Sequence, residues 1–465
     1  MKKYDAIIIG TGQAGVPLAA KFDKEGKTVA IIEKNKIGGT CVNDGCTPTK
    51  SYVAAARRAF VTKNSQEFGV ETGNVKVDLK KIKQRKDKIV SDSHENIEGL
   101  FDSLEKLDYY EGEGTFSSEN IIEIKTKDGK TEQVKGKQIF INVGAKAIIP
   151  KEYKDLDYLT NTSILELEDT PKHLIVLGAG YIGLEFSQAF ARFGSKVTVL
   201  ERNERFLKKE DKDVAEAIKE TLEKEGITIH TNSKNTQITQ EKGISKVSFE
   251  KDGKTHTLEG SHILLSVGRE PNTKALHLEK AGVKTDEKGY IKVNQHFQTN
   301  KEHIFALGDC NGEGAFTHTA FNDFEILREF LFGKKDRKLS DRIQCYAMFI
   351  DPPLSRIGMN EEQAREKMKE DDSLEITKGF RPMTKVARAT EMGETDGMMK
   401  VLVDKKTEKI LGATFFGISA DETIHGIIDV MYAQKSYKTI RDAVHIHPTV
   451  SELIPTMLGS LKEFK

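Results

Sequence analysis

Two cysteines, Cys41 and Cys46, stand close together in the segment GGTCVNDGCTPTK, residues 38–50. The chain has four cysteines in all, and no second pair or nearby histidine completes the three or four ligands that a metal site usually needs. A disulfide that closes so short a loop removes little entropy from the unfolded chain, which argues against a structural crosslink. In a reducing compartment a disulfide is more often catalytic than structural. The pair therefore predicts a redox-active dithiol.

The spacing of the two cysteines constrains the local backbone. In an ideal helix, residues five positions apart lie roughly 8.6 Å from each other at Cα, whereas a disulfide tolerates at most about 7 Å. We therefore expect regular helix to be broken at Gly45, with Asn43 and Asp44 beside it. Pro48 is compatible with a helix that starts just before it. A thiol at a helix start has its thiolate stabilised, which suits nucleophilic exchange.

A dithiol that attacks and leaves needs a proton carrier, and HIHPTVSE near the C-terminus offers one. His447 titrates near neutral pH, and Glu452 could bind its other ring nitrogen and fix the tautomer. The same segment allows a structural interpretation, because Thr449 and Glu452 are spaced as a capping box that opens a terminal helix. His445 and His447 could also form a metal pair, but no third ligand accompanies them. The sequence leaves the catalytic base and the helix cap open.

The first apolar run leads into a glycine-rich loop. AIIIGTGQAG supplies Gly10, Gly12 and Gly15, a helical stretch follows, and the next strand-like run, TVAIIEK, carries Glu33. In such a unit the glycines permit a tight turn, close approach of the backbone to a pyrophosphate, and helix–strand packing. The helix N-terminus attracts the phosphates and the acid can bond a ribose hydroxyl. The unit predicts a dinucleotide site.

The same unit occurs again in LIVLGAGYIGLEFSQAFARFGSKVTVLER, residues 174–202. Gly178, Gly180 and Gly183 follow its first strand, and Glu201 ends its second. The acid follows the first glycine by 23 residues in both units. Two units imply two dinucleotides, one held permanently and one exchanged, because a hydride has to pass between them.

Three further apolar runs end in small or charged residues that could face these ligands. The runs and their ends are QIFINVGAKAIIP with Gly144 and Ala145, SHILLSVGREPNT with Gly268 and Arg269, and HIFALGDCNG with Gly308 and Asp309. Asp309 could be a plain turn residue, but ligands of open α/β sheets sit at the carboxyl ends of strands. From about Asp341, strand-like and helical runs alternate without a glycine fingerprint, which predicts a separate α+β domain.

The composition argues against several classes of function. Among 465 residues, 72 are Lys or Arg and 72 are Asp or Glu, so the formal net charge is zero. No basic face stands out, which argues against nucleic acid or an anionic membrane as a partner. The apolar run at the start is too short for a signal peptide or a spanning helix. We therefore expect a cytoplasmic protein of two to four domains.

Taken in their order, the motifs resemble those of one family. The first glycine motif, GGTCVNDGCTPTK, GAGYIGLE, SVGREPNT, ALGDC and HPTVSE are similar to motifs of the class I pyridine nucleotide–disulfide oxidoreductases, the group of dihydrolipoamide dehydrogenase, glutathione reductase and mercuric reductase. DPPLSRIGMNEEQARE and the later VARA resemble mercuric-reductase-like and reactive-chlorine-resistance flavoenzymes most. The resemblance implies an α/β fold with two Rossmann-like nucleotide-binding domains plus a C-terminal α+β dimerisation domain.

The resemblance also implies domain bounds and a homodimer. An FAD-binding domain would comprise residues 1–148 and 267–338, an NAD(P)-binding domain residues 149–266, and a dimerisation domain residues 339–465. His447, oriented by Glu452, would act as base at the dithiol of the partner subunit, so that each active site needs both chains.

Residue roles carry over from the family in the same way. Cys46 would face the flavin as the charge-transfer thiolate, and Cys41 would be the interchange thiol that meets substrate. Lys50 and Glu185 would pair beside the flavin ring, and Tyr181 would cover the nicotinamide pocket. FAD would sit on Gly10, Gly12, Gly15, Glu33, Thr40, Ala145 and Asp309. The other residues expected to bind cofactor are Lys50, Gly144, Thr317, His318, Gly178, Gly180, Tyr181, Ile182, Gly183, Glu201, Gly268 and Arg269. No resident metal site is expected.

The implied reaction passes electrons from a nicotinamide through FAD to the Cys41–Cys46 disulfide and on to an acceptor. Glu201 favours NADH, since a carboxylate bonds a 2′-hydroxyl and repels a 2′-phosphate. Arg202 and Arg205 follow closely and could still accommodate the phosphate of NADPH.

Departures from the family patterns bear on the acceptor. The terminal TMLGSLKEFK lacks the paired cysteines with which mercuric reductases hand over mercury, and Thr47 and Thr49 stand where lipoamide enzymes usually have a small apolar residue and serine. We therefore predict an NAD(P)H-dependent reductase of a metal ion or small oxidant. Dihydrolipoamide dehydrogenase is the alternative, favoured by the intact pair of His447 and Glu452. A non-catalytic flavoprotein redox sensor is a third, disfavoured because such a protein needs no cysteine pair.

Overall fold

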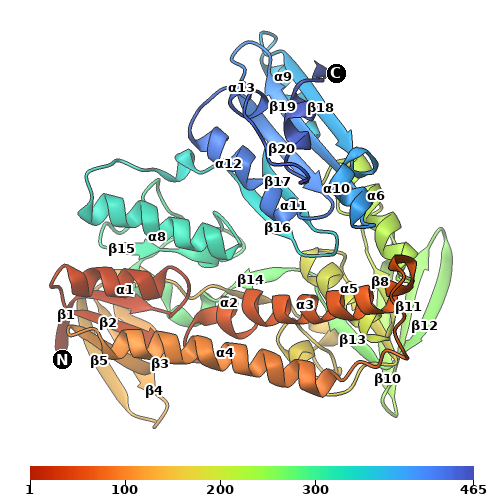
Figure 1. The fold of residues 1–465 in the computed structure, drawn as a ribbon. Coiled ribbons are helices and arrows are strands. Elements are labelled where there is room, and N and C mark those ends of the chain that lie inside the picture. The colour runs from red at the N-terminus through yellow and green to blue at the C-terminus, as the bar shows by residue number, and fades with distance from the viewer. Residues whose placement is uncertain (465) are drawn as a thin grey trace.

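The chain's first apolar run forms the centre of a mostly parallel sheet in this computed structural model, which describes residues 1–464 (Figure 1). Strand β1 pairs in parallel with β2 and β5, β3 and β15 extend the sheet at either side, and β4 joins β3 to β5 antiparallel. These strands are β1 (Lys2–Ile9), β2 (Val29–Glu33), β3 (Leu107–Ser118), β4 (Ile121–Thr126), β5 (Thr131–Ile141) and β15 (Ile304–Ala306). Ile7, Ile8 and Ile9 are buried, as expected for a parallel strand covered on both faces.

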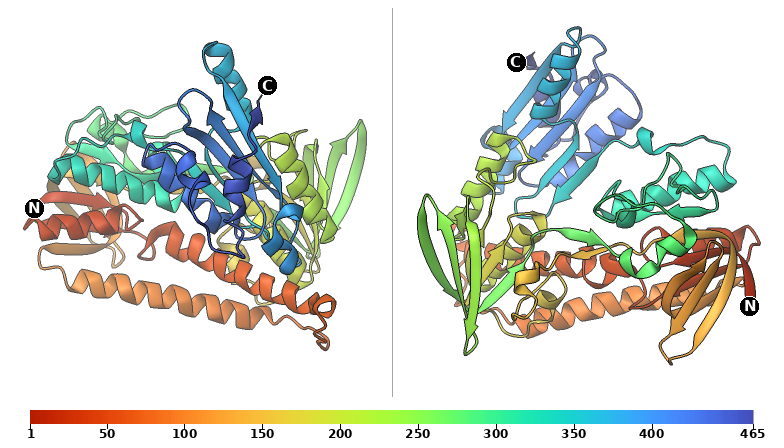
Figure 2. Two further views of the ribbon diagram at one scale, coloured as in Figure 1. Left: turned by 45° about the horizontal axis from the view of Figure 1, so that its top comes forward. Right: turned by 180° about the vertical axis from the view of Figure 1, so that it is seen from behind.

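A second parallel sheet repeats this plan. Its order is β13-β7-β8-β9, with the strands β7 (His173–Leu177), β8 (Lys196–Leu200), β9 (Thr228–His230) and β13 (His262–Leu265). A separate antiparallel sheet of β10 (Lys234–Glu241), β11 (Ile244–Lys251) and β12 (Lys254–Gly260) lies at the end of the molecule opposite to the first sheet (Figure 2). Strands β6 (Ala145–Ala147) and β14 (Arg269–Pro271) form a short ladder.

The third part is an antiparallel sheet of order β16-β17-β20-β19-β18-β21. Its strands are β16 (Cys345–Met348), β17 (Leu354–Gly358), β18 (Ile376–Pro382), β19 (Met398–Asp404), β20 (Ile410–Phe416) and β21 (Lys462–Glu463). Its helices are α9 (Glu361–Glu370), α10 (Ala387–Glu391), α11 (Ala420–Thr423), α12 (His425–Tyr432), α13 (Lys438–Arg441) and α14 (Leu453–Leu458). The predicted fold class, two Rossmann-like units and a C-terminal α+β unit, is confirmed.

Two long helices run side by side across the molecule and connect its parts (Figure 1). Helix α3 (Cys46–Lys63) starts at the second cysteine, and α4 (Leu79–Asp102) is the polar, lysine-rich stretch. The remaining helices are α1 (Gly15–Lys24), α2 (Gly39–Asn43), α5 (Tyr181–Phe193), α6 (Lys212–Lys224), α7 (Leu278–Ala281) and α8 (Thr317–Phe332). Within residues 1–464, no helix combines the length and the apolar character that crossing a membrane requires.

Helix α3 shares a hydrophobic core with the second sheet and the C-terminal sheet. Tyr52 of α3, Phe190 of α5 and Phe416 of β20 all belong to this cluster and are fully buried. The rings of Tyr52 and Phe190 lie 6.3 Å apart at their centroids. A helix that begins at the dithiol is therefore fixed against both other parts of the molecule.

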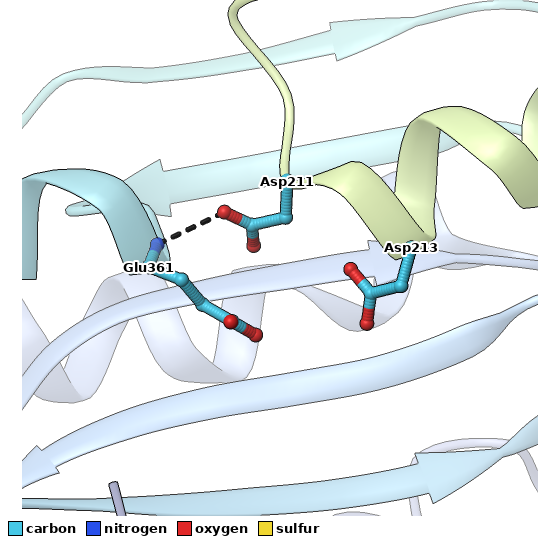
Figure 3. Close-up of side chains that lie close together, drawn as sticks. All are labelled: Asp211, Asp213 and Glu361. Atoms are coloured by element: carbon cyan, nitrogen blue, oxygen red, sulfur yellow. Dashed lines mark hydrogen bonds between the residues drawn. The ribbon is translucent and has the colours of Figure 1, made fainter. Parts of the chain in front are cut away.

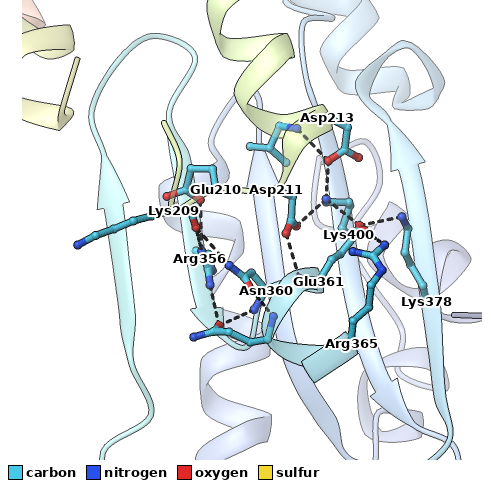
Figure 4. A network of polar contacts seen from close by, with 12 residues as sticks. Lys209, Glu210, Asp211, Asp213, Arg356, Asn360, Glu361, Arg365, Lys378 and Lys400 are labelled. Carbon is cyan, nitrogen blue, oxygen red and sulfur yellow. Dashed lines mark hydrogen bonds and ion pairs between the residues drawn. The ribbon is translucent and has the colours of Figure 1, made fainter. Parts of the chain in front are cut away.

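Three carboxylates gather where the second sheet's α6 meets the C-terminal sheet (Figure 3). Asp211, Asp213 and Glu361 are close enough to hold a cation, and the ammonium group of Lys400 takes that place, 2.7, 2.8 and 2.9 Å from the three in turn. Figure 4 shows Lys400 at the centre, with Lys378 on the far side of Glu361. Burial would raise the pKa of Glu361, but hydrogen bonds from the two lysines bring it down to about 2. The cluster is an internal ion network between two parts of the chain.

Replacing Lys400 with Met should destabilise this junction strongly. Its loss leaves the buried Asp211 carboxylate without a counter-ion, and we expect the free energy of unfolding to fall by about 3 kcal/mol or more. Urea denaturation measures the change. Lys405→Met is the matched control, because Lys405 pairs with Glu375 on the surface, where a pair is worth about 1 kcal/mol at most. Equal, small losses in both variants would contradict a central role for Lys400.

Candidate functional site

One cavity of about 1720 Å³ extends between the three parts of the chain. Most sequence-predicted site residues line it, namely Gly10, Gly12, Glu33, Thr40, Cys41, Cys46, Lys50, Gly144, Tyr181, Ile182, Glu185, Arg269, Asp309, Thr317 and His318. The predicted residues outside its lining are Gly15, Ala145, Gly178, Gly180, Gly183, Glu201, Gly268, His447 and Glu452. The two nucleotide units, the dithiol and the C-terminal sheet therefore meet at one space.

The dithiol lies at a break between two helices, as its spacing predicts. Helix α2 carries Cys41 and ends at Asn43, and α3 begins at Cys46, with Gly45 between them in a conformation outside the helical region. A Cβ at Gly45 would lie 2.8 Å from the carbonyl oxygen of Thr40, so this turn has no room for a side chain. Both cysteines carry free thiols. The two sulfurs interact directly with one another.

The two thiols differ in acidity. A hydrogen bond from Cys41 is the main cause that lowers the pKa of Cys46 to about 6; burial opposes it, and the hydroxyl of Thr317 and the charge of Lys50 add to it. The Thr317 Oγ1 lies 3.1 Å from the Cys46 Sγ. The hydrogen bond to Cys46, followed by burial, raises the pKa of Cys41. These opposite shifts in pKa favour the negative charge on Cys46 and the proton on Cys41.

An ion pair links the helix of the dithiol to the second nucleotide unit. Lys50 Nζ donates to Glu185 Oε2 at 2.6 Å, and the other carboxylate oxygen accepts the backbone N–H of Phe349 at 2.8 Å. The ammonium group lies 4.6 Å from the centre of the Phe349 ring. The Glu185 side chain is almost fully buried, so its charge is held by these contacts in place of water.

The first glycine loop is closely packed. Gly10 has φ +107°, and a Cβ at Gly12 would lie 2.7 Å from the Asn142 side-chain oxygen. That oxygen accepts the N–H of Gly15 at 3.0 Å. The carboxylate of Glu33 accepts both the N–H and the hydroxyl of Thr11, at 3.0 and 2.9 Å, and so closes the loop against the next strand.

The second glycine loop has a similar backbone conformation, with more space at its middle glycine. Gly178 has φ +100°, and Glu201 accepts the N–H of Ala179 at 3.0 Å and that of Asn203 at 2.8 Å. A Cβ at Gly180, which corresponds to Gly12, would meet nothing within 4 Å. The two loops thus have similar backbones, and the space around them differs at the middle glycine.

Charged and aromatic groups complete the wall of the cavity. Asp309 lies 3.8 Å from the guanidinium group of Arg269, which also donates to the carbonyl of Ala145. Burial raises the pKa of Asp309, and Arg269 opposes that shift. The Nε2–H of His318 donates to the Cys345 carbonyl, 2.8 Å away, and burial lowers the pKa of His318.

His447 and Glu452 contact each other but lie away from the cavity of their own chain. The Nδ1 of His447 lies 2.9 Å from one carboxylate oxygen of Glu452. The hydroxyl of Thr449 accepts the N–H of Glu452 at 3.2 Å, which is half of the capping box. The Glu452 carboxylate contacts the histidine and does not cap the helix. Helix α14 begins at the next residue. The imidazole is about three-quarters exposed.

Sequence reasoning missed several residues that line the cavity, among them Asn142, Phe316, Tyr346 and Phe349. Asn142 carried a usable signal, because a polar amide follows the buried strand QIFI at its carboxyl end. The three aromatic residues carried none, since an aromatic side chain in an apolar stretch is indistinguishable from a core residue.

Comparison with known proteins identifies this arrangement. Residues 4–323 match the family described as pyridine nucleotide-disulphide oxidoreductase, and residues 345–458 match its dimerisation domain. The chain belongs to this family. It is an FAD-dependent pyridine nucleotide–disulfide oxidoreductase, and the resemblance inferred from its motifs is confirmed.

Similar proteins of this family cover the whole chain. The probable pyridine nucleotide-disulfide oxidoreductase RclA of Escherichia coli (strain K12) is 35% identical over 99% of this chain and 100% of its own length. The mercuric reductase of Staphylococcus aureus is 31% identical over 97% of this chain and 81% of its own length. The dihydrolipoyl dehydrogenase of Geobacillus stearothermophilus is 31% identical over 97% of this chain and 94% of its own length.

A solved structure agrees closely with this fold. It is described as the Cu(II) complex of HOCl-induced flavoprotein disulfide reductase RclA from Escherichia coli, and it has a TM-score of 0.88 and 33% identity over 99% of both chains. The expected similarity to mercuric-reductase-like and reactive-chlorine-resistance flavoenzymes is therefore confirmed.

The residues around the first glycine loop fit the FAD of this oxidoreductase family. The cavity is large enough for a dinucleotide, and the loop leaves no side chain between its backbone and the space beside it. Glu33 stands at the end of β2, where the family's acid lies near a ribose. Asp309 faces the same space from the carboxyl end of β15.

The two glycine loops predict different responses to the same substitution. Gly12→Ala would push a methyl group against Asn142, and we expect the purified variant to hold far less FAD than the wild type. Gly180→Ala is the matched control, because its methyl group enters open space, and it should retain as much flavin as the wild type. Flavin absorbance per chain, with thermal unfolding of both variants, measures the effect. Equal flavin content would contradict the difference in packing.

The acidity of Cys46 is also testable. In the reduced protein, iodoacetamide should alkylate Cys46 with a midpoint near pH 6, because the reactive thiolate is populated above its pKa. Thr317→Val removes a hydrogen bond to the thiolate, so the midpoint should move upward. Peptide mass spectrometry after labelling between pH 4 and 10 (about one point per half unit) follows each cysteine separately. A wild-type midpoint near 9 would show that the thiolate is not stabilised.

Proposed function

We propose that this flavoprotein reductase passes electrons from NADH through FAD to Cys41 and Cys46, and from there to a metal ion or a small oxidant. The convergence of the dithiol, the ion pair of Lys50 with Glu185 and the first glycine loop on one cavity carries the proposal. A protein that only sensed or scaffolded would need none of these groups.

In this proposal the two cysteines have separate tasks. When bound, FAD supplies the two-electron chemistry that connects a nicotinamide with a disulfide. Cys46, with its low pKa and its contacts to Thr317 and Lys50, is the thiolate kept beside the ring. Cys41 keeps its proton and is the thiol that meets the acceptor after deprotonation.

His447 is proposed as the base for Cys41 of a partner subunit. It is too far from the cavity of its own chain to line it, and its imidazole is exposed and oriented by Glu452. The apolar side chains of Val444 and Ile446 beside it are fully or largely exposed, as on a face that a partner covers. The match to the family's dimerisation domain supports a homodimer.

The proposed division into domains follows the sheets. An FAD-binding domain of residues 1–148 and 267–338 contains the first sheet, an NAD(P)-binding domain of residues 149–266 contains the second, and residues 339–465 form the dimerisation domain. We place the enzyme in the cytoplasm, where a reducing environment keeps its thiols available between turnovers.

NADH is the proposed electron donor. Glu201 follows β8 directly, with its carboxylate fixed by two backbone N–H groups, in the position for a ribose hydroxyl. Arg205 is turned away toward the carbonyl of Glu210 and the carboxylate of Glu362, 3.4 Å from the latter. Arg202 stays exposed, so NADPH is the second donor to test.

A metal ion or small oxidant is the proposed acceptor. Oxidation of the Cys46 thiolate and the Cys41 thiol to the disulfide releases two electrons and one proton, so one turnover would reduce two Cu(II) ions to Cu(I) or one two-electron oxidant. A structure of a similar protein is described as a Cu(II) complex, which supports copper as a candidate. The threonines beside Pro48 also separate this dithiol from those of lipoamide enzymes.

The proposal is tested by oxidation of NADH and NADPH with Cu(II), Hg(II), a quinone and lipoamide as acceptors. We expect turnover with a metal ion or quinone, and a loss of about 100-fold or more in Cys41→Ser and Cys46→Ser, because each removes a covalent participant. Cys310→Ala is the matched control: its thiol is buried, does not line the cavity, and should leave turnover unchanged. Turnover with lipoamide alone would overturn the proposed acceptor.

Dihydrolipoamide dehydrogenase is the second candidate, favoured by the contact between His447 and Glu452. A dithiol substrate needs this base in each thiol–disulfide exchange step, whereas reduction of a metal ion needs it only to take the proton of Cys41. His447→Gln should therefore slow oxidation of dihydrolipoamide by about 100-fold or more and affect Cu(II) reduction far less. Fast NAD⁺-dependent oxidation of dihydrolipoamide that His447→Gln abolishes would select this candidate.

A further inference from the structure

The loop between β8 and α6, residues 201–211, is attached to the C-terminal sheet at its far end (Figure 4). The carbonyl of Lys209 accepts hydrogen bonds from Arg356 at 2.9 Å and from the Asn360 amide at 3.2 Å. The carboxylate of Asp211 accepts the N–H of Glu361 at 2.9 Å. The loop starts at the acid proposed to bind the ribose of NADH, so these contacts bear on that site.

Glu210 is one of the buried residues of this loop, and its carboxylate is held from the C-terminal sheet. The hydroxyl of Tyr346 donates to one oxygen, and Arg356 Nη1 lies 3.5 Å from the other. The same guanidinium nitrogen donates to the Tyr346 oxygen at 3.2 Å. Glu210, Tyr346 and Arg356 therefore form a closed polar triangle between β16, β17 and the nucleotide loop.

The ring of Tyr346 continues this contact into the cavity. It is parallel to the ring of Phe316, with centroids 5.7 Å apart and 1° between the planes. Phe316 in turn packs on Tyr181, 5.4 Å away at the centroids. All three rings line the cavity, and Tyr181 is the residue expected to cover the nicotinamide pocket.

One N–H donor of Arg356 has no hydrogen-bond partner among the described residues. The residue lines the cavity but is only 7% exposed, and its Nε is buried with no hydrogen-bond partner among the described residues. A buried donor without a partner is unfavourable unless a ligand or water meets it.

We propose that Tyr346 is a positioning residue for the nicotinamide nucleotide. Its hydroxyl holds Glu210 and with it the loop at the ribose end, while its ring holds Phe316 and Tyr181 at the nicotinamide end. One side chain thus fixes the distance between the two ends of the bound nucleotide. This inference rests on the proposed use of NADH or NADPH by the second nucleotide unit.

The decisive variant is Tyr346→Phe, which removes one hydroxyl and keeps the ring stack. Glu210 then loses a donor, and we expect the Kd for NAD⁺, measured by calorimetry on the oxidised holoenzyme, to rise about five- to tenfold. The KM for NADH should rise by a similar factor. The flavin spectrum and the reoxidation of dithionite-reduced enzyme by the acceptor should not change, because neither step involves the loop.

Asp213→Asn is the matched control. Asp213 lies just beyond the same loop and also contacts the C-terminal sheet, through Lys400, but has no contact with the aromatic stack. It should lower the thermal stability and leave the Kd for NAD⁺ unchanged. If Tyr346→Phe lowers only the stability, or if both variants weaken NAD⁺ binding equally, the positioning role is overturned and the triangle is merely structural.

Wild-type behaviour separates this inference from the proposed function. If the wild-type holoenzyme binds and oxidises NADH while Tyr346→Phe matches it in Kd and KM, the positioning role alone fails. If the wild type binds neither NAD⁺ nor NADP⁺ and oxidises neither NADH nor NADPH, the proposed electron donor is contradicted, whatever Tyr346 does. Glu210→Gln, which keeps the shape of the side chain and removes its charge, should reproduce the effect of Tyr346→Phe on Kd.

Discussion

The break between helices α2 and α3 is the constraint on which this site depends. A continuous helix would hold two cysteines at this spacing too far apart to exchange a disulfide. The turn at Gly45 ends one helix and starts the next, so Cys46 becomes the first residue of α3 and touches Cys41 and Thr317. Local backbone geometry thereby sets both the proximity of the sulfurs and the difference in their acidity.

The position of α3 transmits this local geometry to the rest of the molecule. One turn along from the dithiol, Lys50 reaches Glu185 on α5, and deeper in the core Tyr52 packs on Phe190 of the same helix. An ion pair and apolar packing therefore hold the second nucleotide unit in a fixed position relative to the dithiol.

The two glycine units show how one local design serves two purposes. Both start with a glycine at positive φ, and in both an acid at the end of the next strand accepts an N–H of the loop. Around Gly12 the protein closes tightly, whereas Gly180 faces open space.

The sequence by itself determined the features that depend on neighbours along the chain: the glycine loops, the acids 23 residues on, and the helix break at Gly45. Only the tertiary structure decided that the Glu452 carboxylate is used on His447 and not on the helix cap, and that Phe316 and Tyr346 line the cavity. Cys46 and Thr317 are 271 positions apart, and such contacts arise from packing between segments that are distant in the chain, which no local spacing encodes.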